Sequence, residues 1–281
     1  MFNRTTRGFG LARSEIVFVC LAALIWASQP AIAGFTAYND CVGPSSGSAA
    51  NVTHYSGYLG GGGGFETPSG LLKDFTTGLF TSVTASLTAS NVAGSIGVMP
   101  SAGTDAYNIF NGIVNLGSSA SYNANSNWFY EVVFTGLDPT KSYEFVTTAN
   151  RNSSSYNGSG SGSRWTKFSI IGADTYTNES STGVTEVSSD VLKMNTGYNT
   201  VLGAIIQWTG ITAADGSFKV RSENVGAGGP GDAFKSYGLQ GFRLVESDVP
   251  TVIPAPGSVL LAVIGLPMLT WVRRSGRGIG A

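Results

Sequence analysis

The sequence predicts an all-β protein: a single antiparallel β-sandwich, with a short hydrophobic helix near each end of the chain. Short segments rich in Val, Ile, Thr and aromatic residues alternate with turn-forming clusters, and no long segment keeps the helical period. The part between the hydrophobic ends is about 220 residues long, a size at which one sandwich commonly forms a single domain. A helical turn is expected only at residues 71–78. The expected strands are residues 82–90, 128–135, 143–149, 165–171, 201–209, 218–222 and 238–246, with turns at 136–139, 157–162, 215–216 and 226–231.

Residues 1–33 contain the three regions of a secretory signal peptide in the right order. Three arginines precede an apolar run at 16–27, and Ala31-Ile32-Ala33 supplies the small-x-small pattern that a signal peptidase cleaves. The apolar run is shorter than the about 20 residues that a membrane-spanning helix needs. A short buried core helix is the alternative. We therefore expect residues 1–33 to form a signal helix that is cleaved off after Ala33.

The N-terminal part of the mature chain is expected to be a loop region. Residues 34–64 are rich in Gly and Ser and end in a run of five glycines at 60–64. Ordering so many residues without a Cβ costs much conformational entropy, so this stretch is expected to be flexible. The β-sandwich domain is expected at 65–246.

Residues 247–258 are expected to be a linker, and residues 259–281 a hydrophobic segment with a basic end. The positive-inside rule places such a basic end in the cytoplasm. The apolar run at 259–272 is short for a membrane span and Pro267 interrupts its helix, so a temporary anchor is expected. An ordinary single-pass tail anchor is the alternative.

The C-terminal region combines Pro254-Ala255-Pro256-Gly257, an apolar run and a terminal arginine cluster. This layout resembles the PEP-CTERM sorting tail of bacterial exosortase substrates, although Ala255 stands where the family usually carries Glu. The resemblance implies that the exported protein is held at the inner membrane until an exosortase-type sorting protease cuts near the Pro-x-Pro motif. The product then reaches the cell surface or the extracellular matrix. The residues of the sorting motif are Pro254, Ala255, Pro256, Gly257, Arg273 and Arg274.

Charge and cysteine content limit the partners and the cross-links of the mature domain. The whole chain has 16 basic and 17 acidic side chains, and loss of six terminal arginines and Glu15 leaves 10 and 16, a formal charge of −6. An acidic surface repels phosphate backbones, so no nucleic acid partner is expected. Cys20 is lost with the signal peptide, so Cys41 has no partner for an intramolecular disulfide. Cys41 is expected to be a buried small residue, with an intermolecular bridge as the alternative.

Residues 128–135 and 143–149 are expected to pair as a hairpin whose aromatic face belongs in the core. The segment VVFTGLDPTKSYEFVTTANR resembles the strand–turn–strand of fibronectin type III and related sandwich domains, in which a Gly-Leu-x-Pro turn precedes a Tyr-bearing strand. The last strand leads directly into the linker, which is common in jelly-roll sandwiches of the galactose-binding type. The resemblances imply a jelly-roll-like architecture and carry no function.

The residues expected of an enzyme are missing. His54 is the single histidine, and no His-x-x-x-His or Cys-x-x-Cys spacing exists for a zinc site. His54 also lacks a nucleophile-elbow pattern nearby. Glu131 and Glu144 are a carboxylate pair in sequence, but strand alternation places both on outer, solvated faces. The chain is therefore not expected to be an enzyme.

A binding role has better support, because carbohydrate modules stack sugars on exposed aromatic rings and hold the hydroxyls with amide and arginine side chains. The loop at 150–164 is long, polar and contains Tyr156 between two arginines. Tyr176 and Tyr198 are further aromatic candidates. The alternative is that Trp165 and Trp208 are core residues and that the polar residues only solvate a loop. The candidate ligand-binding residues are Arg151, Asn152, Tyr156, Arg164 and Trp165.

The favoured interpretation is an exported, non-enzymatic surface or matrix protein with a structural or adhesive role. A lectin-like module that binds extracellular polysaccharide is the alternative. No cofactor is expected, and calcium on Asp215-Gly216-Ser217 or Asp174-Thr175 is a lesser alternative. The expected partners are the sorting protease, the membrane during transient anchoring and a polysaccharide.

Overall fold

The computed structural model describes residues 34–41, 47–56, 67–122, 127–160, 162–225 and 235–248. The signal peptide, the glycine run at 60–64, the turn at 226–231 and the sorting tail lie outside these ranges. Among the described residues, no helix is long and apolar enough to cross a membrane. The two terminal helices therefore stay predictions.

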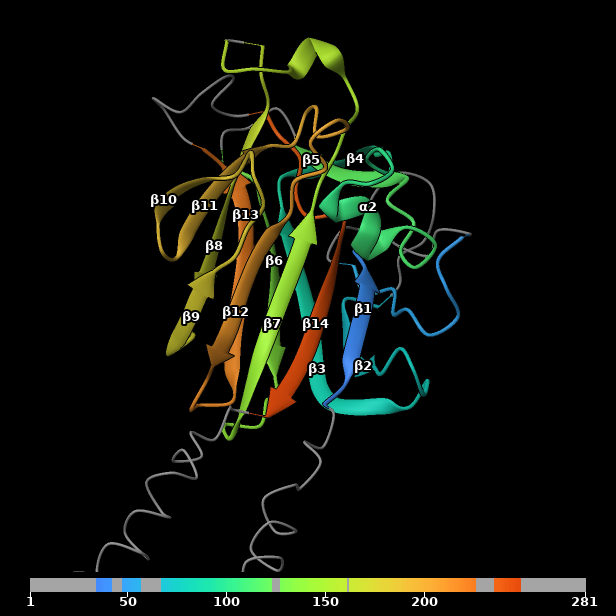
Figure 1. Cartoon of the computed structure of the whole chain (residues 1–281), viewed down its shortest axis with the longest axis vertical. Coiled ribbons are helices and arrows are strands. Elements are labelled where there is room, and N and C mark those ends of the chain that lie inside the picture. The colour runs from blue at the N-terminus through green and yellow to red at the C-terminus, as the bar shows by residue number, and fades with distance from the viewer. Residues whose placement is uncertain are drawn as a thin grey trace, which may run out of the picture.

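The prediction of an all-β fold built from antiparallel sheets is confirmed. Two large sheets lie face to face, and every pairing within them is antiparallel (Figure 1). The five-stranded sheet has the spatial order β1 (Thr36–Asp40), β14 (Gly241–Asp248), β7 (Lys141–Thr148), β12 (Ile206–Thr212) and β9 (Thr175–Asn178). The seven-stranded sheet has the order β10 (Thr185–Ser188), β11 (Val191–Asn195), β8 (Trp165–Ile171), β13 (Ser217–Asn224), β6 (Phe129–Thr135), β3 (Phe80–Ser90) and β2 (Ser69–Lys73). A small sheet pairs β4 (Val92–Ile96) with β5 (Ser118–Tyr122), and the short helices are α2 (Asp105–Phe110) and η1 (Ser154–Tyr156).

The expected hairpin between residues 128–135 and 143–149 is wrong, because β6 and β7 belong to different sheets. β6 pairs with β3 and β13, whereas β7 pairs with β14 and β12. The aromatic faces of β6 and β7 meet across the core instead of lying side by side. The rings of Phe134 and Phe145 pack edge to face with their centroids 5.8 Å apart. Each of these two strands therefore buries every second side chain, as the strands of a hairpin would. However, β6 and β7 are not hydrogen-bonded neighbours.

The turn at 136–139 carries the chain from one sheet to the other and is fixed by Tyr143. The Tyr143 hydroxyl accepts a hydrogen bond from the Asp138 backbone N–H (2.7 Å) and donates one to Glu246 Oε2 (2.9 Å). Burial raises the pKa of the Tyr143 hydroxyl, so it stays protonated at neutral pH and keeps both bonds. Leu137 is buried and its N–H donates to the Gly216 carbonyl (3.1 Å). The turn is thus tied to both sheets.

Three other sequence predictions are wrong in position. The loop region expected at 34–64 contains strand β1, which pairs with β14, so the sandwich begins before residue 65. The strand expected at 201–209 begins at Ile206, because Gly203 has a φ of +51° and the Asn199 side chain holds Ala204 in a turn. The helical turn expected at 71–78 is limited to residues 74–78, where the Gly78 N–H donates to the Asp74 carbonyl (2.8 Å). Residues 71–73 belong to strand β2 instead.

The core lies between the inner faces of the two sheets. Phe134 of the seven-stranded sheet contacts Phe242 of the five-stranded sheet, with ring centroids 5.2 Å apart. Trp208 is fully buried and packs on Phe145. Cys41 is also fully buried in this core, as the first of the two sequence interpretations expected. Such burial is the main source of stability in a domain of this kind.

The outer face of the five-stranded sheet is covered by a second apolar cluster. Here Phe110 of helix α2 and Phe75 pack around Tyr38 of β1, with ring centroids 6.4 Å and 5.2 Å from the tyrosine ring. Thr104 caps the helix, since its hydroxyl accepts a hydrogen bond from the Tyr107 N–H. The buried members of this second cluster are Tyr38, Val52, Ala106, Phe110, Val114, Leu116, Val146 and Ile205.

The outer face of the seven-stranded sheet carries ion pairs instead. Glu131 of β6 lies 3.3 Å from Lys219 and 3.7 Å from Arg221, both on β13. Glu223 then links Arg221 (3.2 Å) to Lys167 of β8 (2.7 Å). We call these five residues the charged ladder.

Candidate ligand-binding site

The loop at 150–164 joins β7 to β8 and crosses from the five-stranded to the seven-stranded sheet at one end of the sandwich. Strand β7 ends there and β14 begins there, since Thr148 pairs with Gly241. We call this end the loop pole, which is at the top of Figure 1. The opposite end, where Lys141 pairs with Asp248, is the terminal pole.

A buried amide at the start of this loop fixes its backbone. The Asn150 N–H donates to Gln240 Oε1 (2.6 Å), and the Asn150 side-chain amide donates to the Val98 carbonyl (3.1 Å). Its Oδ1 accepts from the N–H groups of Asn152 (3.0 Å) and Asn199 (2.9 Å). Asn150, Asn199 and Gln240 are almost wholly buried. Because buried amides are costly to leave unpaired, this network specifies one arrangement of the loop.

Asn199 fixes the next turn in the same way. Its amide nitrogen donates to the Ala204 carbonyl (2.9 Å) and to Thr148 Oγ1 (3.2 Å), and its Oδ1 accepts from the Ala204 N–H (2.8 Å). The enclosed residues include Val201 and Leu202, whose side chains are 64% and 58% exposed. The turn therefore holds two apolar side chains at the surface on a rigid backbone.

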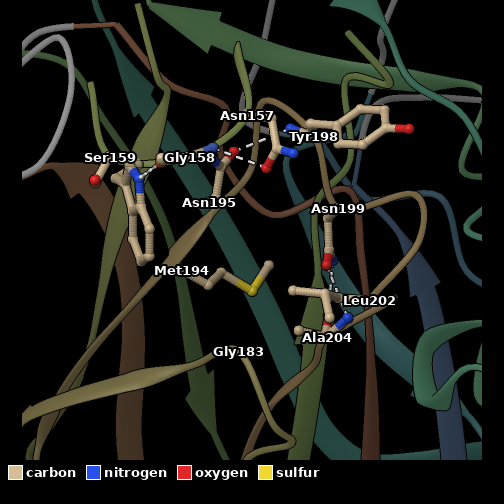
Figure 2. Close-up of a pocket in the computed structure, with 11 residues that line it drawn as sticks. Asn157, Gly158, Ser159, Gly183, Met194, Asn195, Tyr198, Asn199, Leu202 and Ala204 are labelled. Carbon is tan, nitrogen blue, oxygen red and sulfur yellow. Dashed lines mark hydrogen bonds between the residues drawn. The ribbon is translucent and has the colours of Figure 1, made fainter. Parts of the chain in front are cut away.

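A hollow of about 310 Å³ lies between this turn and the loop at 150–164 (Figure 2). Met194, Leu202 and Ala204 supply apolar lining, while Asn157 and Asn195 supply amides. None of the described residues that line the hollow has a charged side chain. The hollow is thus a neutral concave site with an apolar wall and a polar rim, the usual composition of a small-ligand site.

Trp165 also lines the hollow and is held there by the loop. Its indole N–H donates to the Gly158 carbonyl (2.8 Å). Asn195, which is the cross-strand partner of Trp165, donates through its amide to the carbonyls of Tyr156 (2.9 Å) and Gly158 (3.3 Å). The indole is partly exposed, so the structure places Trp165 at the surface and Trp208 in the core.

The structure does not bring the other four predicted site residues into the hollow. The Arg164 guanidinium stacks on the Tyr156 ring, 4.4 Å from its centroid. Burial raises the pKa of the Tyr237 hydroxyl, and the positive charge of Arg151 lowers that pKa by a smaller amount. Asn152 Oδ1 accepts a hydrogen bond from Thr200 (2.6 Å). These side chains shape the loop, and of the five predicted residues Trp165 alone lines the hollow.

Several lining residues escaped the sequence prediction because they come from separate segments. Met194 and Asn195 end strand β11, whereas Gly183, Leu202 and Ala204 lie in the turns before β10 and β12. Tyr198, which was a further candidate, does line the hollow. Figure 2 shows its ring pointing away from Met194, and its N–H donates to Asn195 Oδ1 (3.0 Å). The adjacent apolar residues at 201–202 are the one local signal, but their composition predicts a strand.

The groups considered for catalysis lie apart from each other. Glu131 lies on the outer face of the seven-stranded sheet, and Glu144 pairs with Arg243 on the five-stranded sheet. His54 is partly buried, and its Nδ1 has no hydrogen-bond partner among the described residues. Burial raises the pKa of the Cys41 thiol well above its ordinary value, which makes it a poor nucleophile.

The carboxylates considered for calcium are engaged in their own turns. Asp174 Oδ2 accepts from the Ala214 N–H (2.6 Å), and Asp215 Oδ1 accepts from the Ser217 N–H (3.0 Å). In the part of the chain that the structure describes, no group of three or more His, Cys, Asp or Glu side chains could hold a metal ion. Calcium binding stays a prediction of the sequence.

Comparisons with known proteins give no match. The chain matches no family model, and neither the curated protein sequences nor the solved structures contain a significant match to it. A function must therefore be argued from the residues and the geometry of this chain.

Proposed function

We propose that the chain is an exported, non-enzymatic protein of a bacterial cell surface or extracellular matrix, with a structural or adhesive role. Its signal peptide is cleaved after Ala33, and its C-terminal tail tethers it briefly to the inner membrane. An exosortase-type protease then cuts near Pro254-Ala255-Pro256-Gly257. The jelly-roll-like sandwich, with a helix in the leader and another in the tail, is part of this proposal.

The observation that carries the proposal is the separation of the two poles. Strand β14 leads from the loop pole to the terminal pole and ends at Asp248, ahead of the sorting tail. Its eight residues span about 25 Å at about 3.3 Å per residue. A tether that begins after Asp248 therefore presents the hollow on the side away from the membrane.

The N-terminal side of the domain supports the same arrangement. Strand β1 begins at Thr36, three residues after the expected cleavage point, and Thr36 pairs with Val245 near the end of β14. Gly34 lies against the Glu246 carbonyl, where an added Cβ would come within 1.9 Å of the oxygen. The domain thus needs no residue before Gly34 to complete its described strands.

A lectin-like role is the second candidate function, and the Trp165 hollow favours it. A partly exposed indole with amides around it is a common way to hold a sugar. Under this second candidate function, the protein adheres by binding an extracellular polysaccharide.

Fractionation of the bacterium, with mass spectrometry of the mature protein, tests the proposed function. We expect a species that begins at Gly34, ends near Pro256 and is found in the surface or matrix fraction. Replacing both prolines, Pro254→Ala with Pro256→Ala, should leave the tail attached and the protein in the inner membrane. The control Ala255→Glu restores the residue usual in PEP-CTERM tails and should be processed at least as completely. A soluble cytoplasmic protein that keeps Met1 and Ala281 would contradict the proposal.

A further inference from the structure

We infer that the Trp165 hollow binds one neutral sugar ring, such as the terminal or side-chain hexose of a polysaccharide, and not an acidic sugar. This inference rests on the proposed lectin-like function and specifies its ligand. The sequence predicts a binding site on the loop at 150–164, between its two arginines. The inferred site is instead the hollow next to that loop.

The absence of charge at the site decides between neutral and acidic sugars. A carboxylate or sulfate buried against protein needs a cation or several hydrogen-bond donors to replace its water. The described lining residues offer no Lys, Arg or His. The guanidinium of Arg164, one of the two arginines of the predicted site, is stacked on Tyr156, and neither residue lines the hollow. A neutral ligand avoids this desolvation cost.

The apolar wall fits the face of a pyranose ring, which presents C–H groups. Trp165 of β8 and Leu202 of the turn at 200–203 form the accessible part of this wall, while Met194 of β11 is almost wholly buried and adds little exposed surface. The indole N–H is already bound to the Gly158 carbonyl, so the ring is oriented before a ligand arrives. A preoriented aromatic ring loses little entropy on binding.

The polar rim fits the hydroxyl edge of the same ring. Asn157 Oδ1 accepts from the Gly158 N–H (2.8 Å), and the Asn157 amide nitrogen has no partner among the described residues. The hydroxyl of Ser159 likewise has none in the described part of the chain, and both residues are exposed. An amide donor and a hydroxyl next to an apolar wall match a sugar, whose hydroxyls both donate and accept.

The size of the hollow limits the ligand to one ring. Its volume of about 310 Å³ is at the lower end of the roughly 300–1,000 Å³ typical of small-ligand sites. An extended glycan chain would need a longer groove, so the rest of a polysaccharide would remain in solvent.

The test is a binding titration of the full-length chain, in a detergent without a sugar headgroup, against neutral hexose oligosaccharides and matched uronic acid oligosaccharides. We expect saturable binding of a neutral series only. Leu202→Arg places a bulky cation at the mouth and should weaken that binding by at least about tenfold. Val201→Arg is the matched control, because Val201 is an equally exposed neighbour that does not line the hollow, and it should change binding by less than about twofold. Trp165→Phe should weaken binding less than Trp165→Ala, with thermal unfolding used to check that both variants fold.

The outcomes separate this inference from the proposed function. Binding of the uronic acid series, lost on Arg151→Ala with Arg164→Ala, would overturn the neutral site and keep a lectin-like role. Absence of binding to both series, with normal surface retention, would overturn the inference and leave the surface assignment in place. Equal loss in the Leu202→Arg and Val201→Arg variants would also overturn it, because the effect would then not depend on the hollow.

Discussion

The outer faces of the two sheets differ in how they meet solvent. The five-stranded sheet is covered by α2 and its neighbouring loops, which bury Phe110 against Tyr38. The outer face of the seven-stranded sheet carries the charged ladder centred on Glu131 instead. Burying apolar side chains contributes several times more stability than exposed ion pairs do. The covered face should therefore dominate the stability of the domain.

The covered face also supports the hollow, whereas the ladder does not. The Ala106 N–H of helix α2 donates to the Gly203 carbonyl (2.9 Å), and the Ser101 N–H donates to the Thr200 carbonyl (2.8 Å). Both carbonyls belong to the turn that carries Leu202. Loosening the covering layer should therefore weaken ligand binding, while changes in the ladder should affect stability alone.

The largest effect is expected for Phe110→Ala, which removes the fully buried ring from the second cluster. The free energy of unfolding should fall by about 3–5 kcal/mol, as for other buried Phe truncations. Urea denaturation measures this change. Phe80→Ala is the control on the seven-stranded sheet, because Phe80 is 62% exposed, and this change should lower the free energy of unfolding by less than about 0.5 kcal/mol. Equal losses would show that the covering layer is not a core.

The next effect is expected for Gly203→Ala, at the contact between the turn and the helix. Gly203 has a φ of +51°, and an added Cβ would lie 2.0 Å from Thr104 Oγ1. Backbone strain and the clash together should cost about 2–3 kcal/mol. Gly210→Ala is the matched control, with a φ of +59° and nothing within 4 Å of the new Cβ, and should cost only about 1–2 kcal/mol. Thermal unfolding of the pair isolates the contribution of the helix contact.

A smaller effect is expected for Glu131→Ala in the charged ladder. Its carboxylate faces two cations and the residue is only 8% exposed, so its loss should cost about 1–2 kcal/mol. Lys167→Ala, at the end of the ladder, should cost less than about 1 kcal/mol. Ligand titration should be unchanged for both variants. A loss of binding would contradict the separation of the two faces.

The smallest effect is expected at Asp74, which follows β2 of the seven-stranded sheet and accepts a hydrogen bond from the Thr36 N–H of β1 in the five-stranded sheet (3.4 Å). Burial raises the pKa of Asp74, but hydrogen bonds from Thr77, Thr76 and Thr36 outweigh this and hold the pKa below its ordinary value. A carboxyl group whose pKa is lower in the folded state than in the unfolded state stabilises the fold when it is ionised. This contribution is fully present above the unfolded-state pKa, and it is lost as the pH falls through the folded-state pKa. Asp74→Asn should therefore reduce stability at neutral pH and have less effect in strong acid. Urea denaturation of both proteins at the two pH values measures this, and equal differences would contradict it.

The sequence predicted seven strands, which correspond to β3, β6, β7, β8, β12, β13 and β14, but it missed the other described strands and the assignment of strands to sheets. Alternation in residues 128–135 and 143–149 correctly predicted that Phe134 and Phe145 are buried. Alternation of apolar and polar residues along a strand indicates only that one face of the strand is buried. The same alternation is expected whether two strands are neighbours in one sheet or face each other across a core. The hydrogen bond between the Tyr143 hydroxyl and Asp138 bends the chain across the sandwich, and composition does not encode it.

The site was less predictable than the fold, for a similar reason. Trp165 could be named because it is aromatic and next to a long polar loop. Asn150 and Asn199 look like ordinary loop residues, yet they are buried and bonded to each other across 49 positions. Such long-range pairing has no local pattern. The resemblance of residues 254–257 to a sorting motif stays a prediction, because those residues lie outside the described ranges.

The position of β14 has a mechanical consequence for a tethered domain. β14 lies between β1 and β7, joined by five residue pairs on one side and eight on the other. The hydrogen bonds of antiparallel strands run perpendicular to the strand direction. A pull transmitted from the tail into Asp248, against a load held at the opposite pole, acts along β14 and shears both ladders simultaneously. The bonds then share the force instead of opening one at a time, so this strand should resist extraction well.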